Sequence, residues 1–214
     1  MVRRRPRPHP SLRTVDEVTR PHRDEAPGFH HVVTRGNNKS QIFIDDYDRT
    51  LFCLIVDRIA RRYGWRVLAY VLMRNHYHLL LSVGEKGLSG GMHDLNLTHA
   101  IQFNARHGRI NHLFGKRYWN RRLVTEGAMR NAARYIVQNP ARAGSTSPPE
   151  HEPWSSYGPT IGLGYPRIAL GLDELLPFFG GTPASARMTF REFCAEAPSV
   201  TELVETRPVP GTAN

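Results

Sequence analysis

The segment VLAYVLMRNHYHLLL, residues 67–81, contains two apolar runs that are separated by a short connection at residues 73–75. Runs of this kind are typical of strands near the core of a sheet. Because alternate side chains of a strand share a face, His76 and His78 should point the same way and Tyr77 to the other face. Two imidazoles side by side on a sheet face are unfavourable to bury unless something lies between them, and a divalent metal ion is the obvious occupant.

Apolar periodicity on both sides of this segment predicts a regular α+β domain. Pro140 disfavours helix at the residue before it, so a late helix should end near Asn139. The expected elements are, in order, a strand at 30–35, a helix between Asp45 and Gly64, strands at 65–70 and 76–83, a helix at 91–107, a fourth strand or irregular hairpin at 113–124, and a helix at 126–139. The first six form the βαββαβ pattern of a ferredoxin-like sandwich, an antiparallel sheet with its helices on one face, and an additional C-terminal helix follows.

The chain outside this pattern is less regular, and four segments are expected. Residues 1–26 are rich in Arg and Pro and read as a disordered basic arm. A compact domain at 27–144 follows. Residues 145–203 form a Pro/Ser/Gly-rich helical appendage with short helices at 170–179 and 190–195, and residues 204–214 form a disordered tail.

The charge balance indicates a polyanionic partner. The 214 residues include 29 Lys and Arg against 19 Asp and Glu, a formal net charge of +10. A basic, arginine-rich protein most often meets nucleic acid, although a ribosome-associated or merely soluble basic protein is the alternative. No apolar run is long enough to cross a bilayer. Cys53 is expected to be a buried thiol, and the two cysteines form no motif, which favours a reducing cytoplasm.

A second set of polar residues lies on the helix predicted at 126–139. Tyr135 and Asn139 are four residues apart and therefore neighbours on one helical face, with Gln138 as a possible substitute for Asn139. If this helix packs beside the sheet, His76, His78 and an amide oxygen could hold one metal ion. Such a shell leaves positions open for a phosphate oxygen and water, which suits catalysis, and an amide ligand favours a hard cation such as Mg²⁺ or Mn²⁺.

These residues carry a resemblance to a known family. The His-Tyr-His sequence is similar to the His-hydrophobic-His signature of HUH endonucleases, and residues 135–144 resemble the nucleophile helix of their single-tyrosine transposases. Within that group the chain most resembles the REP-associated tyrosine transposases, over roughly residues 28–158. The runs that carry this are 34–38 (TRGNN), 63–65 (YGW), 73–80 (MRNHYHLL), 112–114 (HLF) and 154–157 (WSSY). Arg74 replaces a proline usual in the family, and residues 118–119 also depart from its pattern.

The resemblance implies a reaction and a substrate. Tyr135 would attack a DNA phosphate to form a 5′-phosphotyrosine with release of a 3′-OH, assisted by a metal on His76, His78 and Asn139. The substrate would be single-stranded DNA folded into hairpins that resemble repetitive extragenic palindromes, and the protein would be cytoplasmic, associated with the nucleoid, and a monomer or homodimer. The candidate DNA-binding residues are Arg35, Asn37, Lys116, Arg117, Trp119, Arg121 and Arg122.

Other interpretations stay open at this stage. Tyr77 is the competing nucleophile by proximity, but strand alternation turns it towards the core. His30 or His31 could support the metal site from a neighbouring strand. The main rival function is a domesticated protein that holds DNA hairpins without cutting them.

Overall fold

The computed structural model describes residues 26–196. The predicted tail at 204–214 and all but the last residue of the predicted basic arm at 1–26 lie outside these described residues. The strands and long helices are β1 (Gly28–Arg35), α1 (Asp46–Tyr63), β2 (Arg66–Met73), β3 (His76–Val83), α2 (Ser89–Arg106), β4 (Trp119–Leu123), α3 (Glu126–Val137) and α7 (Pro183–Ala195). The short helices are η1 (Asn37–Lys39), α4 (Asn139–Arg142), η2 (Pro149–His151), α5 (Tyr157–Thr160), α6 (Leu172–Leu175) and η3 (Leu176–Phe178).

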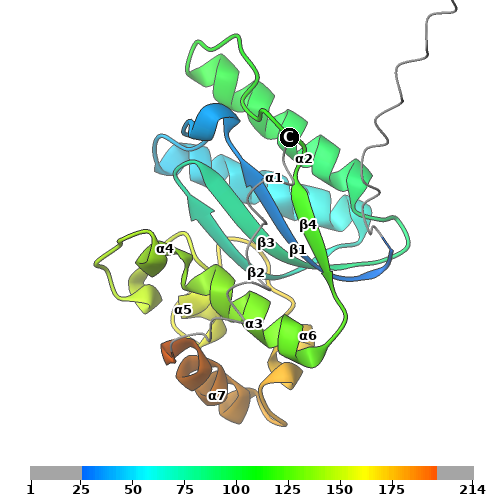
Figure 1. The fold of residues 1–214 in the computed structure, drawn as a ribbon, viewed down its shortest axis with the longest axis vertical. Coiled ribbons are helices and arrows are strands. Elements are labelled where there is room, and N and C mark those ends of the chain that lie inside the picture. The colour runs from blue at the N-terminus through cyan, green and yellow to red at the C-terminus, as the bar shows by residue number, and fades with distance from the viewer. Residues whose placement is uncertain (1–25, 197–214) are drawn as a thin grey trace, which may run out of the picture.

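The four strands form one antiparallel sheet in the order β2-β3-β1-β4. The crossover helices α1 and α2 lie together on one face of this sheet, and α3 lies on the other (Figure 1). The predicted ferredoxin-like α+β sandwich with an additional helix is therefore confirmed. The order places β3, with its two histidines, beside β1 in the centre of the sheet.

The predicted elements are found with shifted ends. The strand β3 and the helix α1 match their predicted bounds, and α1 ends at Gly64, whose φ of +69° favours glycine. The strand β2 begins after Trp65, whose indole lies against Gly91 and donates a hydrogen bond to the carbonyl of Gly87. A Cβ at Gly91 would come within 2.2 Å of that indole, so the start of α2 requires glycine there.

The last helix, α7, begins seven residues earlier than the predicted start at Phe190. Its first turn has a capping box, in which Thr182 and Ser185 each accept a hydrogen bond from the other's backbone N–H. Pro183 occupies the first helical turn, where its missing N–H is not needed. The apolar spacing alone pointed only to the end of this helix.

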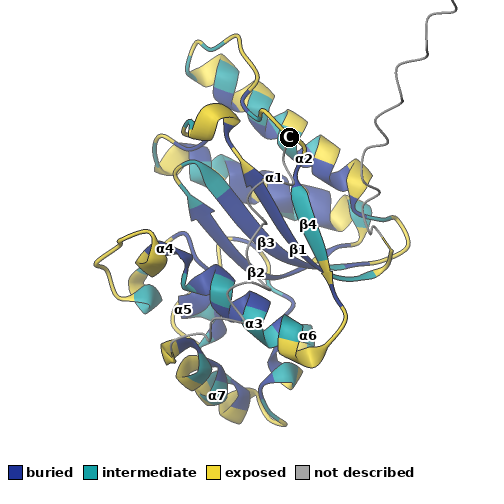
Figure 2. Ribbon diagram, in the orientation of Figure 1, coloured by how far each residue is buried: buried dark blue, intermediate teal, exposed yellow. Residues whose placement is uncertain are grey.

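The strands β1, β2 and β3 are largely buried on both faces, whereas most of β4 is only partly buried (Figure 2). Tyr77, Leu79 and Leu81 of β3 pack towards α1 and α2, in a core that includes Phe52. Leu80 faces the opposite way, in a second core formed with α3 and α7. Because both faces are covered, β2 and β3 carry apolar residues on both faces, and the histidines of β1 and β3 are the main buried polar groups among them.

The C-terminal segment, predicted as an appendage, contributes to this second core. It also lies along the edge of β2. There the backbone N–H of Leu72 donates to the carbonyl of Trp154, and the backbone N–H groups of Ser156 and Gly171 donate to the carbonyls of Tyr70 and Val67. These bonds cover an edge that would otherwise expose unpaired backbone groups. The domain boundaries themselves stay a prediction.

No helix within residues 26–196 is long and apolar enough to cross a membrane. Cys53 and Cys194 are both buried and unpaired, which confirms the expected state of Cys53. Burial raises the pKa of each thiol to about 12, so both stay protonated at neutral pH. The cytoplasmic location stays a prediction.

Candidate active site

The two histidines of β3 lie on the face of the sheet that α3 covers. Their ring centroids are 5.1 Å apart. Tyr77 points to the opposite face, where it is fully buried and its hydroxyl donates to Asn96 at 2.6 Å. The alternation expected from the sequence therefore separates the two histidines from the tyrosine between them.

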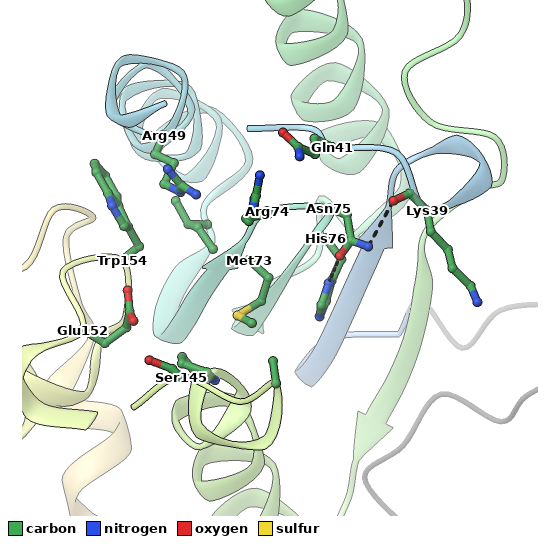
Figure 3. A pocket seen from close by; sticks show the side chains of 13 residues that line it. Lys39, Gln41, Arg49, Met73, Arg74, Asn75, His76, Ser145, Glu152 and Trp154 are labelled. Carbon is green, nitrogen blue, oxygen red and sulfur yellow. Dashed lines mark hydrogen bonds between the residues drawn. The ribbon is translucent and has the colours of Figure 1, made fainter. Parts of the chain in front are cut away.

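His76 is held in one orientation by its neighbour Asn75 (Figure 3). The Asn75 amide nitrogen donates to the carbonyl of Lys39 at 3.1 Å, which leaves its Oδ1 to accept from His76 Nδ1 at 2.7 Å. In a neutral imidazole the other nitrogen then carries a lone pair. Burial, assisted by the charge of Arg35, lowers the pKa of His76 to about 4, so this ring is neutral at pH 7.

The lone pair of His76 Nε2 faces the oxygen of Asn139. The two atoms are 3.4 Å apart, and the Asn139 amide nitrogen points to the carbonyl of Tyr135 at 3.5 Å. With the amide in this orientation, two acceptor atoms face each other. A cation between them would turn an unfavourable contact into ligation, so the donor set fits a divalent metal ion.

The second histidine, His78, is bonded to the neighbouring strand. Its Nδ1 lies 2.9 Å from Nε2 of His31, and the two rings are stacked at 5.2 Å. Burial, together with the charge of Arg121, lowers the pKa of His31 to about 3. Burial, with the charge of neighbouring groups, also lowers the pKa of His78 well below its ordinary value. Both rings are therefore neutral at pH 7.

Tyr135 lies next to this pair of rings. Its ring centroid is 5.7 Å from that of His78 and 5.8 Å from that of His31. The guanidinium of Arg142 lies 5.2 Å from the centre of the tyrosine ring. Tyr135 is only partly buried, so its side chain adjoins the histidines and a cation and is also open to solvent.

The helix α3 that carries Tyr135 is fixed against α7. The guanidinium of the buried Arg134 stacks on the ring of Phe193 at 3.9 Å. Gln138 donates to the carbonyl of Cys194 at 2.6 Å, so Gln138 is engaged with α7 and Asn139 faces the histidines. The sequence favours Asn139 as the ligand, with Gln138 only as a possible substitute.

The predicted single helix at 126–139 is interrupted at Gln138. The helix α3 ends at Val137, and α4 starts at Asn139 with Pro140 in its first turn. Pro140 therefore ends the first helix as expected, but the chain continues for one further helical turn.

Three of the candidate DNA-binding residues lie around the histidines. Arg35 is the register partner of His76 at the end of β1. Trp119 and Arg121 of β4 project from the same face of the sheet as His31, and the Trp119 ring meets the His31 ring edge-on at 5.4 Å. These side chains form one border of the site.

The other candidates lie elsewhere. Arg122 alternates to the face that α1 and α2 cover. Lys116 and Arg117 are exposed and line a hollow of about 710 Å³ beside α2. Asn37 lies in η1, where its backbone N–H donates to Leu113 at 2.9 Å. The DNA-binding role of all seven residues stays a prediction.

A cavity of about 580 Å³ opens beside His76 (Figure 3). Lys39, Arg49 and Arg74 contribute positive charge to its lining, and Trp154 forms part of its wall. The guanidinium of Arg49 lies 5.6 Å from the Trp154 ring. The lining next to the candidate metal site is thus mainly basic, with Glu152 as its one carboxylate and a largely buried Trp154.

Within residues 26–196, no three His, Cys, Asp or Glu side chains come together in a group that could hold a metal ion. For a metal at His76 and His78, the Asn139 oxygen, 3.4 Å from Nε2 of His76, is a nearby candidate for a third protein ligand. Among transition metals and hard cations, such a mixed set suits Mg²⁺ or Mn²⁺ when a phosphate completes the shell.

Sequence reasoning missed two groups at this site. It gave no role to Asn75, which adjoins the first histidine, or to Arg142, which lies seven residues after Tyr135. It named His31 only as one of two possible supports. The partner of His78 could not be chosen, because the register between β1 and β3 is not visible in either strand alone.

Comparison with known proteins agrees with this architecture. The family model of IS200-like transposases matches residues 29–139, more than half of the chain. A solved REP-associated tyrosine transposase bound to a REP hairpin is similar in fold, with 21% identity, a TM-score of 0.54, and coverage of 70% of this chain and 90% of that chain. A candidate transposase from Deinococcus radiodurans R1 has 15% identity and a TM-score of 0.40 over 59% of this chain and 98% of its own. No curated protein matches the sequence. The chain belongs to the family of IS200-like transposases.

Proposed function

We propose that this transposase cleaves and rejoins single-stranded DNA next to hairpins through a covalent 5′-phosphotyrosine at Tyr135. The observation that carries the proposal is the convergence of Tyr135 with His76, His78 and Asn139 on one face of the sheet within one chain. A phenol beside two neutral imidazoles and an amide oxygen combines a nucleophile with a set of metal ligands.

The proposed reaction conserves the phosphodiester energy. The Tyr135 oxygen attacks the scissile phosphorus, the bond between phosphorus and O3′ breaks, and O3′ takes up a proton as the phenol loses one. The fragment 3′ of the cut stays attached through its 5′ phosphate. Attack by a different 3′-OH reverses these steps, so joining needs no ATP.

His76, His78 and Asn139 would hold the divalent ion, Mg²⁺ or Mn²⁺. When bound, the ion would neutralise charge on the phosphoryl oxygens and align the leaving oxygen. The protein itself contributes rigidity: Asn75 fixes the His76 ring and α7 fixes the helix that carries Tyr135.

Positive side chains around the phenol would orient the phosphate. The Arg142 guanidinium lies at the Tyr135 ring, and Arg35 and Arg121 border the histidines from β1 and β4. Guanidinium groups bind phosphate oxygens in a bidentate manner and favour the developing negative charge. Arg142 would in this way bring positive charge close to the proposed nucleophile and to the scissile phosphate.

The proposed substrate rests on charge and on the fold relative. The solved REP-associated tyrosine transposase was bound to a REP hairpin, and this chain has its fold and a net charge of +10. The basic cavity beside His76 would accept an unpaired nucleotide next to the hairpin, because the cations of its lining suit a phosphate.

A nicking assay tests this function. An end-labelled oligonucleotide with a hairpin and single-stranded flanks should yield nicked product and a slower-migrating protein adduct with Mg²⁺ or Mn²⁺. EDTA should abolish both, and a blunt duplex of the same stem should yield neither. Tight hairpin binding without any cleavage at micromolar protein would instead favour the non-catalytic hairpin-binding alternative.

Binding should depend steeply on salt. Each phosphate neutralised contributes about −0.7 to −0.9 to the slope of log affinity against log salt, because counterions are released. When affinities from fluorescence anisotropy are plotted as log affinity against log salt, the points should fall on a straight line. Arg121→Gln should make the slope of this line shallower by the contribution of about one phosphate contact. Equal affinity for the blunt duplex and the flanked hairpin would contradict the role given to unpaired bases.

A further inference from the structure

A neutral His78 ring can bind a metal through Nε2 only if its proton is on Nδ1. Its Nδ1 lies 2.9 Å from Nε2 of His31, and one proton must lie between these two nitrogens. If His31 carries it, His78 Nδ1 is the acceptor and the proton of His78 is on Nε2, where it blocks ligation. If His78 Nδ1 carries it, His78 Nε2 has a free lone pair.

We propose that His31 is a positioning residue, which accepts the hydrogen bond from His78 Nδ1–H and so directs His78 Nε2 at the metal. The inference rests on the proposed metal site. In this proposal, His31 of β1 determines which tautomer His78 of β3 adopts.

The surroundings hold the His31 ring in place for this task. Its backbone is fixed by the register that pairs His31 with Leu80, so its side chain is the diagonal neighbour of His78 on the same face. Both rings are buried, with exposed fractions of 1% and 2%. Trp119 meets the His31 ring edge-on from β4, and Tyr135 does so from α3.

The same arrangement exists at the other histidine ligand. Asn75 Oδ1 accepts from Nδ1 of His76, which leaves the Nε2 of His76 directed at Asn139. Each candidate ligand thus has its Nδ1 bonded to a neighbouring side chain. Such partners fix the tautomer and orientation of metal-binding histidines, and their loss typically weakens metal affinity by about 10–100-fold.

The wild-type protein gives the first test, since it needs no substitution. Long-range ¹H–¹⁵N spectra of protein labelled with ¹⁵N-histidine distinguish a proton on Nδ1 from one on Nε2. With Mg²⁺ added, His78 should carry its proton on Nδ1 and His31 should be unprotonated at Nε2. A His78 proton on Nε2 would overturn the proposal.

Variants give the second test, with Mn²⁺ affinity measured by electron paramagnetic resonance. His31→Phe keeps a planar ring but no acceptor and should weaken Mn²⁺ binding by about 10–100-fold. His31→Gln places an amide oxygen near the position of Nε2 and should stay much closer to wild type. His30→Phe is the matched control, because His30 adjoins His31 but faces the opposite side of the sheet, and it should leave affinity unchanged.

The outcomes separate this inference from the proposed function. If wild type binds Mn²⁺ and a folded His31→Phe binds it equally well, only the role of His31 is wrong. Equal losses for the Gln and Phe variants also overturn that role, because they indicate general disruption. If the wild type binds no Mn²⁺, the proposed metal site is wrong and the role of His31 falls with it.

Discussion

Tyr135→Phe is expected to abolish strand cleavage while the protein still folds and binds hairpin DNA. The substitution keeps the ring that packs beside His78 and His31 and removes only the oxygen. Loss of a covalent nucleophile typically reduces turnover on the order of 10⁴-fold or more. Quantitative nicking assays with Mg²⁺ and anisotropy with labelled hairpin would measure the two properties separately.

Tyr77→Phe is the matched control for this experiment. Tyr77 differs from Tyr135 in facing α1 and α2, where its hydroxyl is bonded to Asn96. Loss of that buried bond should lower the free energy of unfolding by about 1 kcal/mol and leave cleavage within a few-fold of wild type. If Tyr77→Phe stops cleavage in a folded protein and Tyr135→Phe does not, the nucleophile has been assigned to the wrong residue.

Replacing both His76 and His78 with Ala should reduce cleavage about as strongly as Tyr135→Phe does. The remaining Asn139 oxygen is a weak ligand on its own, so the double variant should lose metal-dependent nicking and Mn²⁺ binding together. Hairpin affinity should change little, because arginines rather than histidines supply the positive charge at pH 7. Isothermal titration with Mn²⁺ and the nicking assay would check this.

His93→Ala serves as the control for the histidine variants. His93 is exposed on α2, on the opposite face of the sheet, and its removal should change neither metal binding nor cleavage. A folded His76→Ala/His78→Ala protein that nicks DNA at the wild-type rate would rule out the assigned metal site.

The sequence was sufficient to predict those features that depend on local spacing. Strand alternation placed His76 and His78 on one face and Tyr77 on the other, as the structure shows. Helical spacing brought Tyr135 and Asn139 together, although the structure breaks the helix between them at Gln138. Their contact survives because Asn139 still points back towards the Tyr135 carbonyl.

Features that depend on the pairing of distant segments could not be predicted. The bond between His31 and His78 joins residues 47 positions apart and exists only in the register that β1 and β3 adopt. Because both faces of the sheet are buried, apolar alternation does not reveal which face each residue takes. Likewise, it is the pairing of β4 with β1 that places Arg121 beside the site and Arg122 on the far face.

The contribution of the C-terminal segment to the second core could not be predicted either, because it depends on tertiary contacts. The sequence of residues 145–203 is rich in proline and predicts only short helices, which is typical of a peripheral segment. In the structure the described part of this segment, up to residue 196, supplies Phe190 to the second core and the partners that hold Arg134 and Gln138 of α3. Their contribution to the position of Tyr135 has no local signal in the sequence.

The most direct measurement of the central claim is mass spectrometry of the covalent adduct. Protein incubated with hairpin-flanked oligonucleotide and Mn²⁺ would be digested with protease and nuclease, and the modified peptide sequenced. The account predicts one modified residue, Tyr135, that carries the fragment from the 3′ side of the cut through its 5′ phosphate, with a free 3′-OH on the released piece. Attachment to another residue, or through a 3′ phosphate, would contradict it.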